Sequence, residues 1–291
     1  MQASRSRARR YGMTPSQALL GLVVAAACGG GGGGGGGEER QLVRIDGSPG
    51  VAPLVLALAD EYRSSAGAAS VHVATGLGAS ARSRAVADRT VDIAMASHGV
   101  NPDEIQRLGL AAHEIARTAV VFAVNASVSV TNLAREQICD IYSGRTRAWQ
   151  LVGGAPGGIV PFMRPATEVD AEVALEHLEC LRGLQVPAHV RVHERADEMA
   201  EALASTPGAI GVTSMTYVRQ SGGRIRAIAL AGVAPTPENV ASGVYALTRR
   251  AMLVTKAAPS PAVDAFLAFI RSEAGARVIR DNGAVPATAS R

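Results

Sequence analysis

From Leu42 onward, short apolar segments of strand length alternate with segments whose apolar residues recur at helical spacing. The strand-like segments end in clusters of Gly, Ser, Pro and Asp, which are typical of turns. We expect strands at 42–45, 71–74, 91–95, 119–125, 159–163, 190–193, 210–213, 225–230 and 245–255. We expect helices at 52–63, 135–143, 170–181, 196–204 and 260–272. A further helix is expected to end at residue 88, and another to begin at residue 101. This alternation indicates an α/β protein with mixed, mostly parallel sheets and helices on both faces.

The N-terminal segment has a different character. Arginines at positions 5, 7, 9 and 10 precede a short apolar run, residues 18–27, which Cys28 closes. A basic start, a short apolar run and small residues at its end form an export signal, and the run is too short to span a bilayer as a helix. The residues before Cys28 resemble a bacterial lipobox, which implies a signal peptide over 1–27, acylation of Cys28 and a lipid anchor on the periplasmic side of the envelope. An ordinary secretory signal is the alternative, and either reading places the protein outside the cytoplasm.

Nine glycines follow Cys28, so residues 28–40 are expected to form a flexible tether. By the coil estimate, the glycine run reaches about 15–18 Å. Removing residues 1–27 removes four of the 29 basic residues and none of the 25 acidic ones, so the remaining chain is formally neutral. A nucleic-acid partner therefore has no support in the charge.

The remaining cysteines, Cys139 and Cys180, are compatible with two readings. An exported protein can pair them in a disulfide, and both can equally be small buried hydrophobic residues. The histidines and cysteines show no zinc-site spacing, so we expect no metal and no cofactor.

A set of short motifs, in a fixed order over about residues 43–286, resembles the phosphate-binding proteins of ABC importers. They are Gly47-Ser48-x-x-Val51-x-Pro53-Leu54, Gly76-x-Gly78-x-Ser80, residues 90–97, Ile141-Tyr142-Ser143-Gly144, Pro207-Gly208-Ala209-Ile210-Gly211, Gly243-x-Tyr245-x-Leu247-x-Arg249 and Gly283-x-Val285-Pro286. The resemblance implies a two-lobed periplasmic solute-binding fold with two hinge crossovers and ligand in the cleft between lobes. We expect lobe 1 to comprise 41–124 and 227–291 and lobe 2 to comprise 125–226. It also implies a monomer that works with ABC permease subunits.

The resemblance also suggests which residues bind ligand. Short hydroxyl side chains and backbone N–H groups between a strand and a helix, together with one arginine, suit an inorganic oxyanion. The expected ligand-binding residues are Ser48, Gly50, Ser80, Ser97, His98, Arg164 and Thr167. His98 has two readings: a histidine there could make anion binding pH-dependent, or it could be an ordinary surface residue in a turn.

One stretch departs from the family pattern. Phosphate-binding proteins carry Ser-Gly-Thr shortly after the arginine, whereas this chain carries Glu168, Val169 and Asp170. Carboxylates at these positions would repel phosphate unless they point away, as acidic residues in the first turn of a helix do.

These observations favour a lipid-anchored solute-binding protein that captures a phosphate-like oxyanion for an ABC importer. The alternative is a ligand-sensing or envelope-interaction module on the same fold, with a different ligand. No Gly-x-Ser-x-Gly, P-loop or complete dinucleotide motif is present, so we expect no enzymatic activity and no catalytic residue.

Overall fold

The computed structural model describes residues 42–65, 68–98, 100–183 and 186–287. The expected signal peptide, Cys28 and the tether lie outside the described residues. Within them, no helix is both long and apolar enough to cross a membrane.

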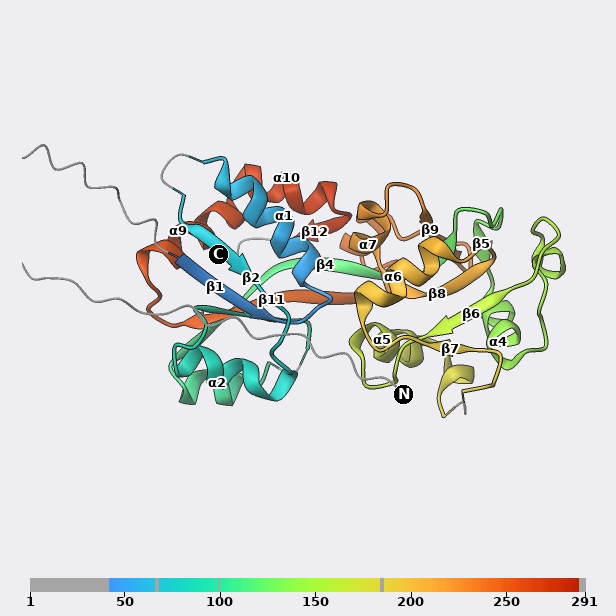
Figure 1. Cartoon of the computed structure of the whole chain (residues 1–291), viewed down its shortest axis with the longest axis horizontal. Helices are drawn as coiled ribbons and strands as arrows, with labels where there is room; N and C mark the ends of the chain where they lie inside the picture. Colours follow the sequence, from blue (N-terminus) through green and yellow to red (C-terminus); the bar gives the residue numbers. More distant parts are fainter. Residues whose placement is uncertain (1–41, 66–67, 99, 184–185, 288–291) are drawn as a thin grey trace, which may run out of the picture. The chain divides into compact units, whose positions relative to one another are not determined.

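A mixed sheet forms the centre of the described chain (Figure 1). Its order is β2 (Ser70–Val73), β1 (Leu42–Gly47), β3 (Ile93–Ala96), β11 (Thr248–Lys256), β4 (Leu110–Asn125), β8 (Ala209–Ser214), β6 (Val160–Met163) and β7 (Arg191–Val192). β12 (Ala284–Pro286) and β9 (Ile225–Ala227) also pair with β4, and β10 (Ala229–Leu230) pairs with β5 (Asn132–Leu133). The pairs of β1 with β2 and β3, and of β6 with β7 and β8, are parallel, whereas β4 and β11 pair antiparallel with their neighbours.

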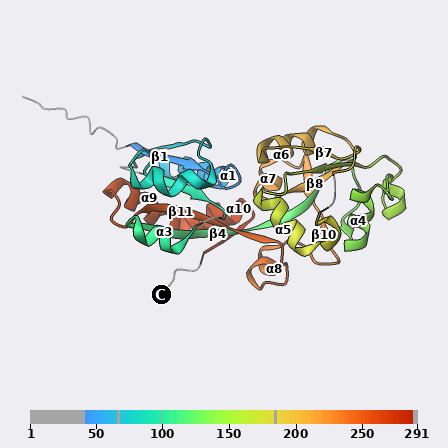
Figure 2. The same ribbon diagram turned by 90° about the horizontal axis from the view of Figure 1, so that it is seen from below.

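Helices cover both faces of the sheet. They are α1 (Ala52–Arg63), α2 (Arg82–Ala87), α3 (Pro102–Arg107), α4 (Arg135–Ser143), α5 (Val169–His177), α6 (Ala196–Ser205), α7 (Met215–Gln220), α8 (Pro237–Ala241), α9 (Pro261–Arg271) and α10 (Glu273–Asp281). Three short 3₁₀ turns, at Ala79–Ala81, Trp149–Val152 and Glu179–Leu181, complete the described elements. Figure 2 shows α5 and α6 flanking β8. The α/β prediction with a mixed sheet is thereby confirmed.

Local sequence explains several helix ends. α1 has Pro53 in its first turn, where a missing N–H costs nothing, and it buries Leu54, Val55, Leu58 and Tyr62 on one face. Asn101 caps α3 by accepting from the N–H groups of Asp103 and Glu104, and Ser260 caps α9 through the N–H of Val263. Both α1 and α4 begin and end where the sequence predicted.

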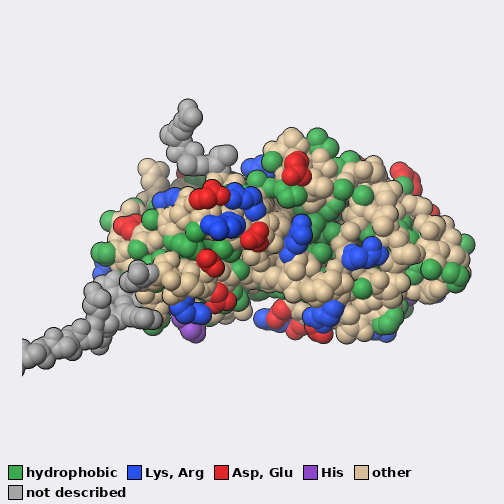
Figure 3. Space-filling view, turned by 90° about the horizontal axis from the view of Figure 1, so that it is seen from above, with side chains coloured by type: hydrophobic (Ala, Val, Ile, Leu, Met, Phe, Trp, Pro, Cys, Tyr) green, Lys and Arg blue, Asp and Glu red, His purple; other side chains and the backbone are tan. Residues whose placement is uncertain are grey.

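The apolar side chains gather in two large clusters and one small one. The first surrounds β4 and β8 and includes Phe122, Tyr142, Trp149 and Phe162. The second surrounds β1, α1 and α9, where the Tyr62 and Phe266 rings meet edge to face at 5.2 Å. The third is small and lies around Val86 and Val254. On the face shown in Figure 3, basic and acidic side chains are interspersed, as expected of a formally neutral globule.

β4 is longer than the sequence predicted. The expected strand begins at residue 119, but β4 begins at Leu110. Its first half pairs with β11 but carries polar residues such as His113 and Glu114, and it is buried only at some positions. The continuous apolar pattern therefore marks only the half beyond Thr118, which is buried throughout.

Cys139 of α4 and Cys180 of the turn Glu179–Leu181 form a disulfide, with Cα atoms 5.9 Å apart. It joins positions 41 residues apart in the sequence, so it limits the freedom of the unfolded chain. Of the two interpretations of these cysteines, the structure therefore supports the disulfide.

Replacing Cys139 and Cys180 together by Ser should lower the free energy of unfolding by about 2–4 kcal/mol, because the loop they close becomes free in the unfolded state. Urea unfolding monitored by circular dichroism measures this. As a control, dithiothreitol should destabilise the native chain but leave the double variant unchanged. An unfolding midpoint of the native chain that does not respond to reductant would contradict the bond.

Candidate functional site

Two groups of parallel strands bring polar residues to their carboxyl ends. β1 and β3 are paired with Gly47 opposite Met95, so Ser48 and Ser97 follow them at the same edge. β6 and β7 are paired with Met163 opposite Val192, so Arg164 and the segment 193–195 follow these two strands together. The carboxyl ends of parallel strands are where α/β proteins commonly place their ligand sites.

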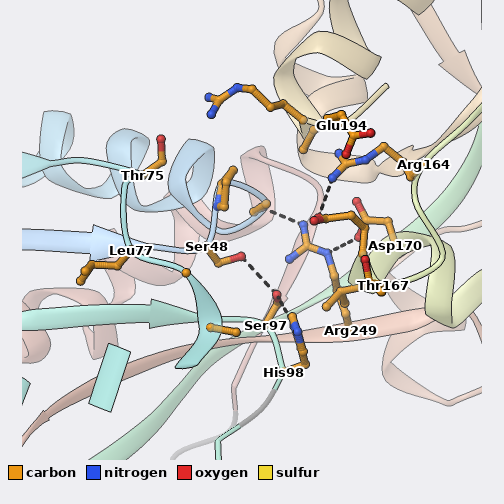
Figure 4. A pocket seen from close by; sticks show the side chains of 18 of the residues that line it. Ser48, Thr75, Leu77, Ser97, His98, Arg164, Thr167, Asp170, Glu194 and Arg249 are labelled. Carbon is orange, nitrogen blue, oxygen red and sulfur yellow. Dashed lines mark hydrogen bonds and ion pairs between the residues drawn. The ribbon is translucent and has the colours of Figure 1, made fainter. Parts of the chain in front are cut away.

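These strand ends surround a pocket of about 290 Å³ (Figure 4). We call it the polar pocket. Its lining residues are Ser48–Gly50, Thr75–Ala79, Arg82, Ser97, His98, Arg164, Thr167–Asp170, Glu194–Ala196 and Arg249. The lining includes four arginines and three acidic residues. The pocket therefore holds many charges of both signs, and its net charge is small.

The first wall of the polar pocket carries hydroxyl groups. The buried Ser48 Oγ lies 3.1 Å from Ser97 Oγ, and Ser97 Oγ lies 3.4 Å from His98 Nδ1. Gly47 precedes Ser48 with a φ of 138°, and a Cβ there would lie 2.3 Å from the Met95 oxygen, so only glycine allows this close turn. Asp46 Oδ1 accepts from the Leu77 N–H at 3.0 Å and thereby fixes the neighbouring loop.

Arg249 links the two walls. Its Nη2 donates to the Gly50 carbonyl at 2.7 Å, and its Nε forms an ion pair with Asp170 Oδ1 at 2.7 Å. Both charged side chains are buried, 3% and 8% exposed. A Cβ at Gly50 would lie 3.1 Å from the guanidinium, so the absence of a side chain there lets Arg249 approach. The predicted site residue Gly50 therefore contributes its carbonyl to an arginine of the chain itself.

Arg164 also has an ion-pair partner within the chain. Its side chain is 4% exposed, and its Nη2 donates to Glu168 Oε2 at 2.6 Å. Its buried Nε has no hydrogen-bond partner within the described residues. Glu168 and Asp170 therefore do not point away from the site, as first-turn acids commonly do; each neutralises an arginine of the pocket.

Arg82 is the most unusual residue of the pocket. It opens α2, is only 7% exposed, and its buried Nε and Nη1 lack a hydrogen-bond partner among the described residues. Burial lowers the pKa of the Arg82 guanidinium, and the nearby charge of Glu168 partly offsets this effect. A buried guanidinium without partners costs free energy, so this position favours an anion.

The second wall ends in Glu194 and Arg195. Arg195 forms an ion pair with Asp197 at 2.9 Å, whereas Glu194 has no ion pair or hydrogen bond recorded in the described part of the chain. Behind this wall, Tyr217 donates to the Pro49 carbonyl at 3.2 Å. Burial raises the Tyr217 pKa to about 12, so this hydroxyl keeps its proton at neutral pH.

The structure brings most of the predicted site residues together. Ser48, Gly50, Ser97, His98, Arg164 and Thr167 all line the polar pocket. Ser80 does not; it is exposed in the 3₁₀ turn Ala79–Ala81, whose first residue lines the pocket instead.

Three further residues were missed by the sequence reasoning. Arg82 lies two residues after the motif Gly76-x-Gly78-x-Ser80, at the start of a helix, and nothing in the local pattern marks it as buried. Arg249 belongs to the matched motif Gly243-x-Tyr245-x-Leu247-x-Arg249 but is not among the expected ligand-binding residues. Glu194 follows an expected strand, as Arg164 does, and this position could have marked it as a candidate site residue.

The structure thus has an α/β fold with a polar, arginine-lined pocket at the carboxyl ends of parallel strands, which is where such folds commonly place small ligands. A family model described as the PBP superfamily domain matches residues 31–274. The chain therefore belongs to the PBP superfamily.

Relatives agree with this assignment. The phosphate-binding protein PstS of Bacillus subtilis is 26% identical over 84% of this chain and 80% of its own length. A phosphate ABC transporter receptor structure from Vibrio cholerae is 27% identical, with a TM-score of 0.57 over 84% of this chain and 99% of that one. A phosphate-bound substrate-binding protein of a phosphate ABC transporter from Clostridium perfringens shares the fold, with a TM-score of 0.69, 24% identity and coverage of 85% and 100%. The resemblance to phosphate-binding proteins of ABC importers is thus confirmed.

Replacing Asp170 by Ala should lower the free energy of unfolding by about 3–5 kcal/mol, because Arg249 would remain buried without its counter-charge. Replacing Asp170 by Leu and Arg249 by Met together should restore most of this loss. Urea unfolding measures both. The exposed pair of Asp60 and Arg63 is the control, and Asp60→Ala should cost no more than about 1 kcal/mol. Equal losses for the buried and exposed pairs would contradict this reading.

Proposed function

We propose that this chain is an extracytoplasmic, lipid-anchored solute-binding protein that captures a phosphate-like oxyanion and delivers it to an ABC permease. The observation that carries the proposal is the polar pocket, whose lining holds both buried arginine N–H groups without hydrogen-bond partners in the described residues and the hydroxyls of Ser48 and Ser97. Charged N–H donors and hydroxyls are the groups that bind oxyanions most strongly. Catalysis forms no part of the proposal, since solute-binding proteins release their ligand unchanged.

We propose that the polar pocket lies between two lobes. Lobe 1 would comprise 41–124 and 227–291, and lobe 2 would comprise 125–226. Ser48, Ser97 and Arg249 then belong to lobe 1, and Arg164, Thr167 and Asp170 to lobe 2. The chain would cross between lobes twice, and closure would bring hydroxyls from one side to arginine donors from the other.

The partners follow from the relatives' names and from the N-terminal sequence. The printed names of the relatives above refer to phosphate and to ABC transport. Acylation at Cys28 would hold the protein on the periplasmic side of the envelope, and the glycine run would let it reach a permease in the same membrane. We propose that it works as a monomer without metal or cofactor.

A second candidate function is supported by the acidic residues of the pocket. Glu168, Asp170 and Glu194 line it, and such carboxylates would disfavour a simple anion. The chain would then be a ligand-sensing or envelope-interaction module with a non-phosphate ligand. Genes for a permease and an ATPase next to this one would favour transport, and their absence would favour the second candidate.

Calorimetry on the purified mature chain tests the first candidate with phosphate, sulfate, arsenate and molybdate. At least one should bind saturably. Arg164→Ala should weaken that binding by about tenfold to a hundredfold or abolish it, because it removes a charged donor and leaves Glu168 unneutralised. Glu168→Gln is the matched control, and it should keep or tighten binding because one repelling charge is gone. No heat with any of the four anions would contradict the proposal.

The lipid anchor is tested separately by metabolic labelling with radioactive palmitate. The full chain should incorporate label, and the Cys28→Ser chain should not, because the thiol that carries the lipid is missing. The Cys139→Ser, Cys180→Ser double variant should remain labelled. Label that persists without Cys28 would contradict acylation at this residue.

A further inference from the structure

Some of the charged groups that line the polar pocket have an ion-pair partner within the chain, and others do not. Arg249 is paired with Asp170, Arg164 with Glu168, and Arg195 with Asp197 outside the lining. Each of these arginines already has a carboxylate of the chain within 2.9 Å. Two charged groups of the lining remain without a recorded ion pair in the described residues: the Arg82 guanidinium and the Glu194 carboxylate.

These two groups have opposite signs and come from different parts of the fold. Arg82 opens α2, whereas Glu194 lies between β7 and α6. Arg82 is more than nine-tenths buried, so it has given up water without gaining a partner at Nε and Nη1. A ligand that places an oxyanion against Arg82 would restore those hydrogen bonds.

The volume of the pocket also exceeds what a small inorganic anion needs. At about 30 Å³ for each liquid water, its 290 Å³ hold roughly ten water molecules. Orthophosphate bound at Arg82 would leave most of that space to water. It would also leave Glu194 with no positive group of the ligand beside it.

We propose that the preferred ligand is a zwitterion, with a phosphonate or phosphate group bound by Arg82 and an ammonium group facing Glu194. This inference rests on the proposed function and narrows its substrate class to small aminoalkyl phosphonates or phosphate esters. The internal ion pairs supply the reason: they cancel the charge of Arg164 and Arg249, so one positive and one negative group are left for the ligand.

Calorimetry with three probes tests the proposal on the full chain purified in detergent. The probes are 2-aminoethylphosphonate, ethylphosphonate, which lacks the amine, and inorganic phosphate. We expect 2-aminoethylphosphonate to bind about tenfold more tightly than either of the others, because only it complements both free charges. A preference of less than threefold over ethylphosphonate, or tighter binding of inorganic phosphate, would overturn the proposal while leaving oxyanion capture intact. If none of the three probes binds, the zwitterion proposal is overturned, and the separate titrations with sulfate, arsenate and molybdate decide whether oxyanion capture fails with it.

Two variants assign the ends of the ligand. Arg82→Met should lower the affinity for all three probes at least tenfold. It should not lower the thermal unfolding temperature, because it removes a buried charge whose Nε and Nη1 have no hydrogen-bond partner in the described residues. Arg84→Met is the matched control, since it removes the same charge from an exposed position of α2. Glu194→Gln should reduce only the preference for 2-aminoethylphosphonate, and Glu176→Gln, outside the pocket, should leave it unchanged. Unchanged affinity in Arg82→Met, or an unchanged preference in Glu194→Gln, would overturn the assignment.

Discussion

The backbone hydrogen bonds of β4 are the constraint on which the rest of the structure depends. A buried strand must pair its N–H and C=O groups on both edges, and β4 does so with different partners along its length. Residues 110–119 pair with β11, and residues 120–124 pair with β8. β9 and β12 pair with it as well. Because β11 carries Arg249 and β8 pairs with the strand that precedes Arg164, these ladders set where the charged walls of the polar pocket can lie.

Electrostatics then decides what this pocket can hold. In a solvent-exposed site four arginines would attract any small anion, but here the chain supplies its own carboxylates to two of the buried ones. The Arg249–Asp170 pair is buried on both sides, so removing either partner alone is expensive, and we expect this pair to remain when a ligand enters. The charge that a ligand meets is therefore that of Arg82 and Glu194. This distinguishes the pocket from one built only of hydroxyls and a single arginine.

Much of the fold could be predicted from the sequence, because local pattern and tertiary structure agree in most elements. α1 and α4 carry clear helical periodicity, and glycine, proline or serine marks their ends. The first half of β4 could not be predicted, because His113 and Glu114 interrupt the apolar pattern there. Ser48, Ser97 and Arg164 could be expected in one site because each follows a strand. Arg82 could not, because arginine in a helix is usually exposed, and only the tertiary structure places this one in a buried pocket lining.

A crystal structure of the protein with tungstate, an electron-dense oxyanion, tests the central claim most directly. We predict tungstate oxygens within about 3 Å of Arg82 Nε or Nη1, with the Arg164–Glu168 and Arg249–Asp170 pairs intact. Tungstate bound to Arg164 and Arg249 after displacement of Glu168 and Asp170, with Arg82 not in contact, would contradict it.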